Sequence, residues 1–142
     1  MFRGGYNHSL DDKNRVIIPQ KLRYELGMDF VITKGLNKCL WVFSEEEFRK
    51  IDATISAQPK LDVHALRLQR FLLAEAIDAT TDIQGRVAIP ANLREHAGID
   101  KEVMVIGAGN RIEIWSKKRW SEITDAITDE MVCESAIAIG LG

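Results

Sequence analysis

The amino-acid sequence predicts an α+β fold, mostly β, in which one unit occurs twice within a chain of 142 residues. The residues Leu-Asp-Asp-Lys-Asn-Arg-Val-Ile-Ile-Pro at 10–19 return as Thr-Asp-Ile-Gln-Gly-Arg-Val-Ala-Ile-Pro at 81–90. After a shift of 71, nine residues of the first copy coincide with identical residues of the second: Asp11, Arg15, Val16, Ile18, Pro19, Leu22, Arg23, Gly27 and Asp29 coincide with Asp82, Arg86, Val87, Ile89, Pro90, Leu93, Arg94, Gly98 and Asp100. Self-similarity at a fixed spacing indicates an internal duplication.

The size of the repeated unit predicts how the two copies combine. One unit of about 45 residues is too small to bury a sheet by itself. We therefore expect one intertwined, pseudo-twofold domain in which the two Asp-to-Arg loops lie at related positions. We assign residues 5–55 to the first module, 56–76 to a linking helix, 77–127 to the second module and 128–142 to a C-terminal tail.

Each copy begins with a strand, a turn and a second strand. Residues 2–10 can form an edge strand, and residues 11–14 have turn chemistry because Asp and Asn bond nearby backbone groups. Gly85 stands where the first copy has Asn14, which predicts a positive φ at that position. The β-prone runs 16–18 and 87–89 predict the second strands.

A short helix, a hairpin and a longer helix complete each copy. A proline before and a glycine after residues 20–26 and 91–97 predict two short helices. Hairpins are expected from strands at 29–33 with 39–43, and at 102–106 with 111–115. Ser44, followed three residues later by Glu47, forms a capping box at the start of a longer helix, and Ser116 occupies the same place in the second copy.

The segment between the copies, residues 56–76, is expected to form one helix with a broad apolar face. It carries the basic residues His64, Arg67 and Arg70. These can contact DNA or pair with acidic groups between subunits, although a solvated or interface face is the more frequent outcome for such a pattern. Residues after Met131 are small and weakly patterned, so we expect them to fray.

Composition indicates a globular protein with no membrane segment. Apolar residues make up 46% of the chain and charged residues 28%. A net charge of −2 by itself argues mildly against nucleic acid, so the position of the charges must decide. Without a secretory h-region or an apolar run of about 20 residues, a cytoplasmic location is expected. Cys39 and Cys133 have no metal-ligand spacing.

The repeated motif resembles a known DNA-binding module. Asp-x-x-x-Arg-Val-x-Ile-Pro, followed by Leu-Arg and Gly, is similar to the swapped-hairpin, AbrB-type module. Two copies in a chain of this length, together with the opening Met-Phe-Arg-Gly and the Arg-Leu-Gln-Arg sequence at 67–70, resemble the family of MraZ transcriptional regulators. Asn14 departs from the glycine that is usual in the family.

The resemblance implies a fold, a function and an assembly. The fold would be a swapped-hairpin, AbrB-like β-barrel with flanking short helices. The protein would be a cytoplasmic, nucleoid-associated transcriptional regulator that binds double-stranded DNA at short, guanine-containing direct repeats. Those repeats would lie in the promoter of the division and cell-wall gene cluster, which includes its own gene. The subunits would assemble into a ring-shaped homo-oligomer.

Arg15 and Arg86 are the first candidates for DNA contact. Each follows a turn and precedes a buried strand, and an Arg fork fits guanine O6 and N7 as well as phosphates. The alternative for both is an ion pair with Asp11 or Asp82 inside the loop. Lys13 can contact phosphate or remain solvated, and Arg3 is a weaker candidate that depends on how the first strand pairs.

Other recurring residues favour structural roles. Asp11, Asn14, Asp82 and Gly85 are expected to hold the turns. Arg23 and Arg94 recur at matched helix positions, where packing of the Arg stem is the preferred interpretation. Trp41, Trp115 and Trp120 are expected in the core or at subunit contacts.

Nothing in the sequence indicates catalysis. His8, His64 and His96 have no zinc spacing, and no Ser/His/Asp or Cys/His set is evident. We therefore expect no enzyme, metal, cofactor or small-molecule substrate. Two alternatives remain: an antitoxin-like protein-binding module on the same fold, and an enzyme on the same barrel, whose only support is the Gly-Ala-Gly turn at 107–109.

Overall fold

The computed structural model describes residues 1–142, and its elements follow the predicted repeat. The first copy contains β1 (Gly5–Ser9), β2 (Arg15–Ile17), α1 (Gln20–Leu26), β3 (Asp29–Lys34), β4 (Leu40–Ser44) and α2 (Glu45–Ser56). The second contains β5 (Ile77–Thr80), β6 (Arg86–Ala88), α4 (Ala91–Ala97), β7 (Glu102–Gly107), β8 (Ile112–Ser116) and α5 (Lys117–Asp125). Helix α3 (Val63–Leu73) joins the copies, and α6 (Asp129–Ala138) ends the chain.

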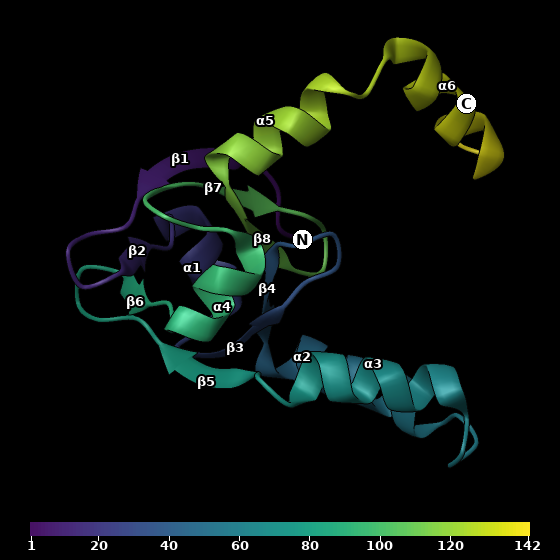
Figure 1. Ribbon diagram of the computed structural model, residues 1–142, viewed down its shortest axis with the longest axis horizontal. Coiled ribbons are helices and arrows are strands. Elements are labelled where there is room, and N and C mark those ends of the chain that lie inside the picture. Colours follow the sequence, from purple (N-terminus) through teal and green to yellow (C-terminus); the bar gives the residue numbers. More distant parts are fainter.

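The two copies exchange their first strands. The larger sheet has six antiparallel strands in the order β1-β7-β8-β4-β3-β5, so β1 joins the hairpin of the second copy and β5 joins the hairpin of the first (Figure 1). The second strands pair with each other as β2-β6. The duplicated, mostly β, swapped-hairpin α+β fold is therefore confirmed.

One hydrophobic core lies between the curved sheet and the β2-β6 ribbon. Its 19 buried residues come from both copies, including Val16 and Val87 from the ribbon. Leu22 of α1 and Leu93 of α4 belong to the same cluster, so both short helices pack on the core. Burial of each large aliphatic side chain contributes about 1.5–3 kcal/mol. Because the buried residues come from both copies, neither copy completes this core alone.

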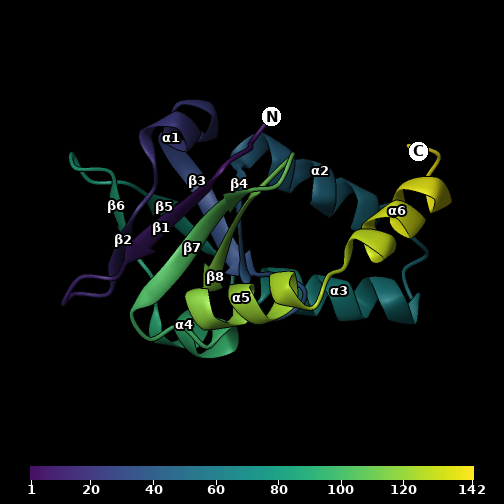
Figure 2. The same cartoon turned by 90° about the horizontal axis from the view of Figure 1, so that it is seen from above.

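The longer helices form two arms at one end of the molecule, which is opposite the β2-β6 ribbon (Figures 1 and 2). One arm is α2 with α3, and the other is α5 with α6. Helix α3 is anchored on the sheet because the Thr33 hydroxyl donates a 2.6 Å hydrogen bond to the Leu72 carbonyl. Every residue of α6 except Ala136 is exposed.

Two local predictions need correction. The linking segment contains one helix, as expected, but α3 covers only Val63–Leu73, because α2 continues to Ser56 and Asp62 caps α3 by accepting from the Ala65 N–H. Residues after Met131 do not fray: α6 forms from Asp129, with the Thr128 hydroxyl accepting a 3.2 Å bond from the Met131 N–H. No helix in the structure has the length and apolar character needed to cross a membrane.

Candidate nucleic-acid interface

The loop between β1 and β2 is organised by the Asp11 carboxylate. Its Oδ1 accepts 2.9 Å hydrogen bonds from the backbone N–H groups of Lys13 and Arg15. The Asn14 N–H donates to the Asp11 carbonyl at 3.0 Å, and Asn14 has a φ of 57°. The carboxylate thus closes a tight turn that leads directly into β2.

The loop between β5 and β6 repeats this geometry. Asp82 Oδ1 accepts 2.9 Å bonds from the N–H groups of Gln84 and Arg86, and the Gly85 N–H donates to the Asp82 carbonyl at 2.9 Å. Gly85 has a φ of 79°, as the exchange of Asn for Gly between the copies predicts.

The β2-β6 ribbon brings the two loops together about a pseudo-twofold axis. Val16 and Val87 face each other at its centre. The Ile18 N–H donates to the Gly85 carbonyl at 2.9 Å, and the Ile89 N–H donates to the Asn14 carbonyl at 3.0 Å. Each positive-φ residue therefore accepts a hydrogen bond from the other copy, which holds both loops at the same end of the molecule (Figure 1).

Arg15 and Arg86 form the ion pairs that were considered as the alternative to DNA contact. Arg15 Nε lies 2.7 Å from Asp11 Oδ2, and Arg86 Nε lies 2.8 Å from Asp82 Oδ2. Arg86 Nη1 also lies 3.9 Å from Asp11 Oδ2, across the two copies. The side chains remain 26% and 29% exposed, and neither terminal nitrogen of Arg15 has a hydrogen-bond partner. The ion pairs therefore orient the guanidinium groups and leave their outer edges open.

The loop carboxylates are charged at neutral pH. The pKa of Asp11 lies below its ordinary value of 3.8, mainly because the carboxylate accepts a hydrogen bond from the backbone N–H of Arg15. The Arg15 side chain lowers this pKa further. The Arg86 backbone and side chain lower the pKa of Asp82 in the same way. The negative charge holds the Arg side chain in place and also reduces the local positive charge.

The structure groups the remaining candidates differently. Lys13 is exposed in the first loop, near Arg15 in the chain. Arg3 does not join them, because it lies at the other end of β1, where the Gly107 N–H donates to the Gly4 carbonyl and Phe2 pairs with Gly109. The first strand pairs with β7, so Arg3 lies beside the β7-β8 turn.

Sequence reasoning did not distinguish Arg23 from Arg94, but their surroundings differ. Arg94 Nη1 donates to the Ile89 carbonyl at 2.5 Å, which is a structural contact within its own copy. The Arg23 guanidinium lies against Gly85 of the second loop, where a Cβ would overlap it, and its buried Nε has no hydrogen-bond partner. The glycine at position 85 is the only sequence signal of this close approach.

A polar cluster that sequence reasoning missed lies at the centre of the outer sheet surface. Glu113 accepts hydrogen bonds from the indole N–H groups of Trp41, at 3.1 Å, and Trp115, at 2.9 Å. Arg111 Nη2 lies 2.8 Å from the same carboxylate, and the Arg111 guanidinium lies 4.4 Å from the Trp41 ring centroid. Glu113 is directly opposite Trp41 where β4 pairs with β8, so the cluster joins the two copies.

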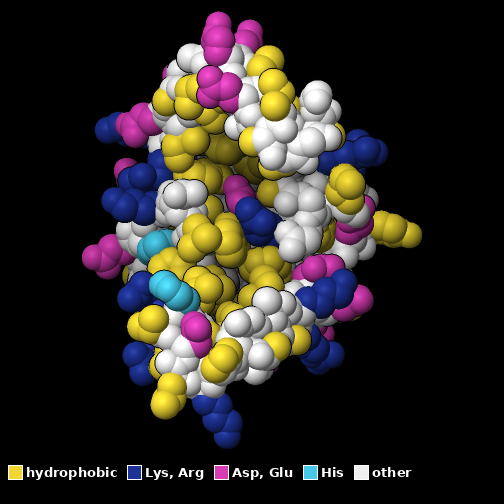
Figure 3. Space-filling model, turned by 90° about the vertical axis from the view of Figure 1, so that its right-hand side faces the viewer, with side chains coloured by type: hydrophobic (Ala, Val, Ile, Leu, Met, Phe, Trp, Pro, Cys, Tyr) yellow, Lys and Arg dark blue, Asp and Glu magenta, His cyan; other side chains and the backbone are white.

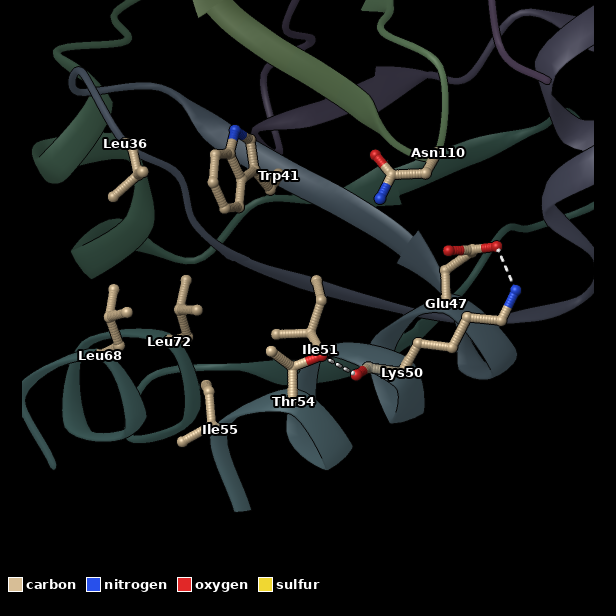
Figure 4. Close-up of a pocket in the computed structure, with 10 residues that line it drawn as sticks. All are labelled: Leu36, Trp41, Glu47, Lys50, Ile51, Thr54, Ile55, Leu68, Leu72 and Asn110. Atoms are coloured by element: carbon tan, nitrogen blue, oxygen red, sulfur yellow. Dashed lines mark hydrogen bonds and ion pairs between the residues drawn. The ribbon is translucent and has the colours of Figure 1, made fainter. Parts of the chain in front are cut away.

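The same outer surface contains an apolar cavity of about 420 Å³ beside α2 and α3. Figure 3 shows the hollow and its hydrophobic surroundings. In Figure 4 the Trp41 ring faces aliphatic side chains of both helices. The apolar lining consists of Leu36, Trp41, Ile51, Ile55, Leu68 and Leu72. No group of three or more His, Cys, Asp or Glu side chains converges in a metal-binding arrangement anywhere in the structure.

The exchanged strands and the paired Asp-Arg loops define a tandem swapped-hairpin protein of the AbrB type. The family described as "MraZ protein, putative antitoxin-like" matches residues 1–71 and again residues 72–136. This chain belongs to the MraZ family.

Curated relatives match nearly the full chain and are named "Transcriptional regulator MraZ". The relative from Thermoanaerobacter sp. (strain X514) is 50% identical over 125 residues, which cover 88% of this chain and 87% of the relative. The relative from Heliobacterium modesticaldum is 43% identical over 143 residues, covering 99% of this chain and all of the relative. The Clostridium tetani relative is 42% identical over 142 residues.

Proposed function

We propose that this protein is a sequence-specific, DNA-binding transcriptional regulator and not an enzyme. The observation that carries the proposal is the pair of loops that present Arg15 and Arg86 from the same end of the molecule. Membership of a family whose curated relatives are named transcriptional regulators supports it. An oriented guanidinium can bond guanine O6 and N7 in the major groove, and exposed Lys13 can contact phosphate.

The finer part of the proposal concerns the DNA site. We expect short, guanine-containing direct repeats in the promoter of the division and cell-wall gene cluster, including this gene. One subunit offers few cationic contacts. A ring-shaped homo-oligomer that reads several repeats raises the overall affinity through effective concentration, with no new type of contact. This arrangement would let a chain with a net charge of −2 bind DNA. A protein bound to chromosomal DNA would be located on the nucleoid, in the cytoplasm.

The modular organisation belongs to the same proposal. Residues 5–55 and 77–127 are the two DNA-binding modules, 56–76 link them, and 128–142 form a tail outside the DNA-binding unit. Because β1 and β5 are exchanged, each module in sequence depends on the other for its sheet.

The substitution Arg15→Ala tests the assignment of the loop. We expect loss of specific promoter binding, about 5- to 150-fold in affinity, because one bidentate base contact contributes about 1–3 kcal/mol. Binding is measured by mobility shift on the promoter upstream of the gene, with unfolding by urea as the check on the fold. Arg49→Ala, an exposed arginine on α2 at the other end of the molecule, is the matched control. Wild-type affinity in the Arg15 variant contradicts the assignment.

Footprinting of the same promoter at two salt concentrations, with native mass measured alongside, tests the repeats and the assembly. Contacts to phosphate release counterions, so the affinity should fall steeply as salt rises. Protection of evenly spaced repeats by a multi-subunit species is the expected result. A single protected site bound by a monomer contradicts the ring proposal.

The description of the matched family as putatively antitoxin-like favours a second candidate, an antitoxin-like protein-binding module on the same fold. In that function a surface outside the loops would hold a small partner protein. A small protein that co-purifies in stoichiometric amount, together with absent promoter binding, would support this candidate against the regulator.

A further inference from the structure

The second loop carries an isoleucine at its tip where the first loop carries an aspartate. Both loops contain a turn of the same form, in which the N–H of the fourth residue donates to the carbonyl of the Asp that opens the turn. The second residue of this turn is Asp12 in the first loop and Ile83 in the second. Ile83 is fully exposed, more than any other large apolar side chain in the protein. The pseudo-twofold symmetry of the scaffold therefore ends at the loop tips.

The position of Ile83 distinguishes it from the other exposed apolar residues. Single apolar side chains on a protein surface are ordinary and need no partner. Ile83, however, lies three residues before Arg86, in one of the two loops that the proposed function places on DNA. Figure 2 shows both loops projecting, as two separate tips, from the end of the molecule opposite the longer helices. A partner that approaches this end meets the loop tips first.

The second loop is held in place on both sides of Ile83. Asp82 Oδ1 accepts a 2.9 Å hydrogen bond from the Gln84 N–H. The Gly85 carbonyl accepts a 2.9 Å hydrogen bond from the backbone of the first copy, and the Arg23 guanidinium lies against Gly85. Because these contacts fix the backbone around it, Ile83 cannot reach the core, and burial of its side chain requires a second molecule.

The charges at the two tips also differ. Asp12 is exposed and has no ion-pair partner within the chain, so the tip of the first loop presents a free carboxylate. In the second loop the only carboxylate, Asp82, is paired with Arg86, and the two tip residues Ile83 and Gln84 are uncharged. A neutral tip can enter a groove lined by phosphates without the repulsion that a carboxylate meets there.

Thymine is the base that an aliphatic side chain can recognise. Its 5-methyl group is an apolar feature of the major groove, and apolar side chains contact it there. We propose that Ile83 packs against the 5-methyl group of a thymine in the half-site that Arg86 contacts, and that the first loop makes no such contact. This contact rests on the proposed function, because it requires the loops to lie on DNA. It makes Ile83 a residue that determines sequence specificity.

A contact made by only one of the two loops makes the two halves of the bound site different. Two identical loops related by a twofold axis would bind the same site equally well in either direction. An isoleucine in one loop and an aspartate in the other select one direction for each subunit. Direct repeats, in which every copy of the site has the same direction, suit subunits that bind in one orientation.

Removal of single methyl groups from the DNA tests this contact with the full chain. Each thymine of a duplex that contains one promoter repeat is replaced in turn by uracil, which lacks the 5-methyl group and keeps the pairing edge. Binding is measured by fluorescence anisotropy. We expect the wild-type protein to bind about fourfold more weakly when a thymine in one half-site is replaced, the loss that corresponds to about one buried carbon group. Replacements in the other half-site should have no effect.

Two alanine variants assign the contact to its loop. Ile83→Ala should bind the thymine duplex about as weakly as wild type binds the uracil duplex, and should lose nothing further with uracil. Asp12→Ala, the matched change at the same place in the first loop, should keep the wild-type response to uracil. Both side chains are exposed, so urea unfolding should show wild-type stability for both variants.

Three results would overturn the contact: wild-type binding that no uracil replacement weakens, a wild-type response to uracil in Ile83→Ala, or loss of that response in Asp12→Ala. In each of these cases the wild-type protein still binds the promoter repeat, so the proposed regulator is retained. Absence of promoter binding by the wild-type protein refutes the regulator and the contact together.

Discussion

At the scale of single residues, one of the differences between the two loops falls on a residue with positive φ and has a measurable cost. Asn14 and Gly85 occupy equivalent positions with φ of 57° and 79°. Asn tolerates this conformation better than most residues, whereas Ala does not. The Asn14→Ala variant should lose about 1 kcal/mol of unfolding free energy. Gly85→Ala should lose more, because glycine adopts this φ without strain and because the new Cβ would displace the Arg23 guanidinium from its place against the loop. Urea denaturation of both variants measures the difference, and equal losses contradict the role given to Arg23.

Acid should weaken the loops through the same carboxylates. Folding lowers the pKa of Asp11 and Asp82 below the ordinary value of 3.8. Their contribution to stability is therefore complete above that value, and it disappears as the pH falls through the lower pKa of the folded state. The double variant Asp11→Asn and Asp82→Asn should lose less stability than wild type between neutral pH and pH about 3. Urea unfolding at several pH values tests this, and parallel pH curves for both proteins contradict it.

At the scale of elements, one carboxylate adds side-chain hydrogen bonds to the β4-β8 pairing in the middle of the six-stranded sheet. Glu113 accepts from two indole N–H groups and from Arg111, and its side chain is only 13% exposed. Glu113→Ala should cost about 2–3 kcal/mol, because it leaves three donors without their acceptor. Glu113→Gln retains one acceptor oxygen and should fall between that variant and wild type.

Chemical denaturation with tryptophan fluorescence measures this loss directly, since two of the three tryptophans donate to Glu113. Glu122→Ala, an exposed glutamate on α5, is the matched control and should change stability little. An unchanged unfolding free energy in Glu113→Ala would show that the cluster is not a stabilising link between the copies.

At the scale of the whole molecule, the exchanged strands make the two halves interdependent. β1 completes the second hairpin and β5 completes the first, and the core cluster draws on both copies. Fragments 1–74 and 75–142 should each fail to fold as a monomer. An equimolar mixture should recover β structure as a 1:1 complex, as judged by circular dichroism and native mass. Cooperative unfolding of either fragment as an isolated monomer contradicts this prediction.

Much of the fold could be predicted because its signals are local. The Asp-to-Arg spacing, the Asn or Gly at the turn and the serines that cap α2 and α5 each act over a few residues. The same locality explains the errors. Pro59 and Asp62 divide the linking segment before α3 begins, and the Thr128 cap starts α6 in a sequence with little amphipathic pattern.

The sequence by itself determined the repeat, the order of elements and the two loops that carry Arg15 and Arg86. Only the tertiary structure decided that Arg3 lies away from those loops, that Arg23 packs on Gly85, and that Glu113 joins two tryptophans. It also revealed the apolar hollow beside α2 and α3. The physical reason is the separation in sequence of the residues that contact each other. Turns and caps depend on hydrogen bonds between near neighbours, whereas the contacts of Arg3, Arg23 and Glu113 join residues far apart in the chain and depend on which strand pairs with which.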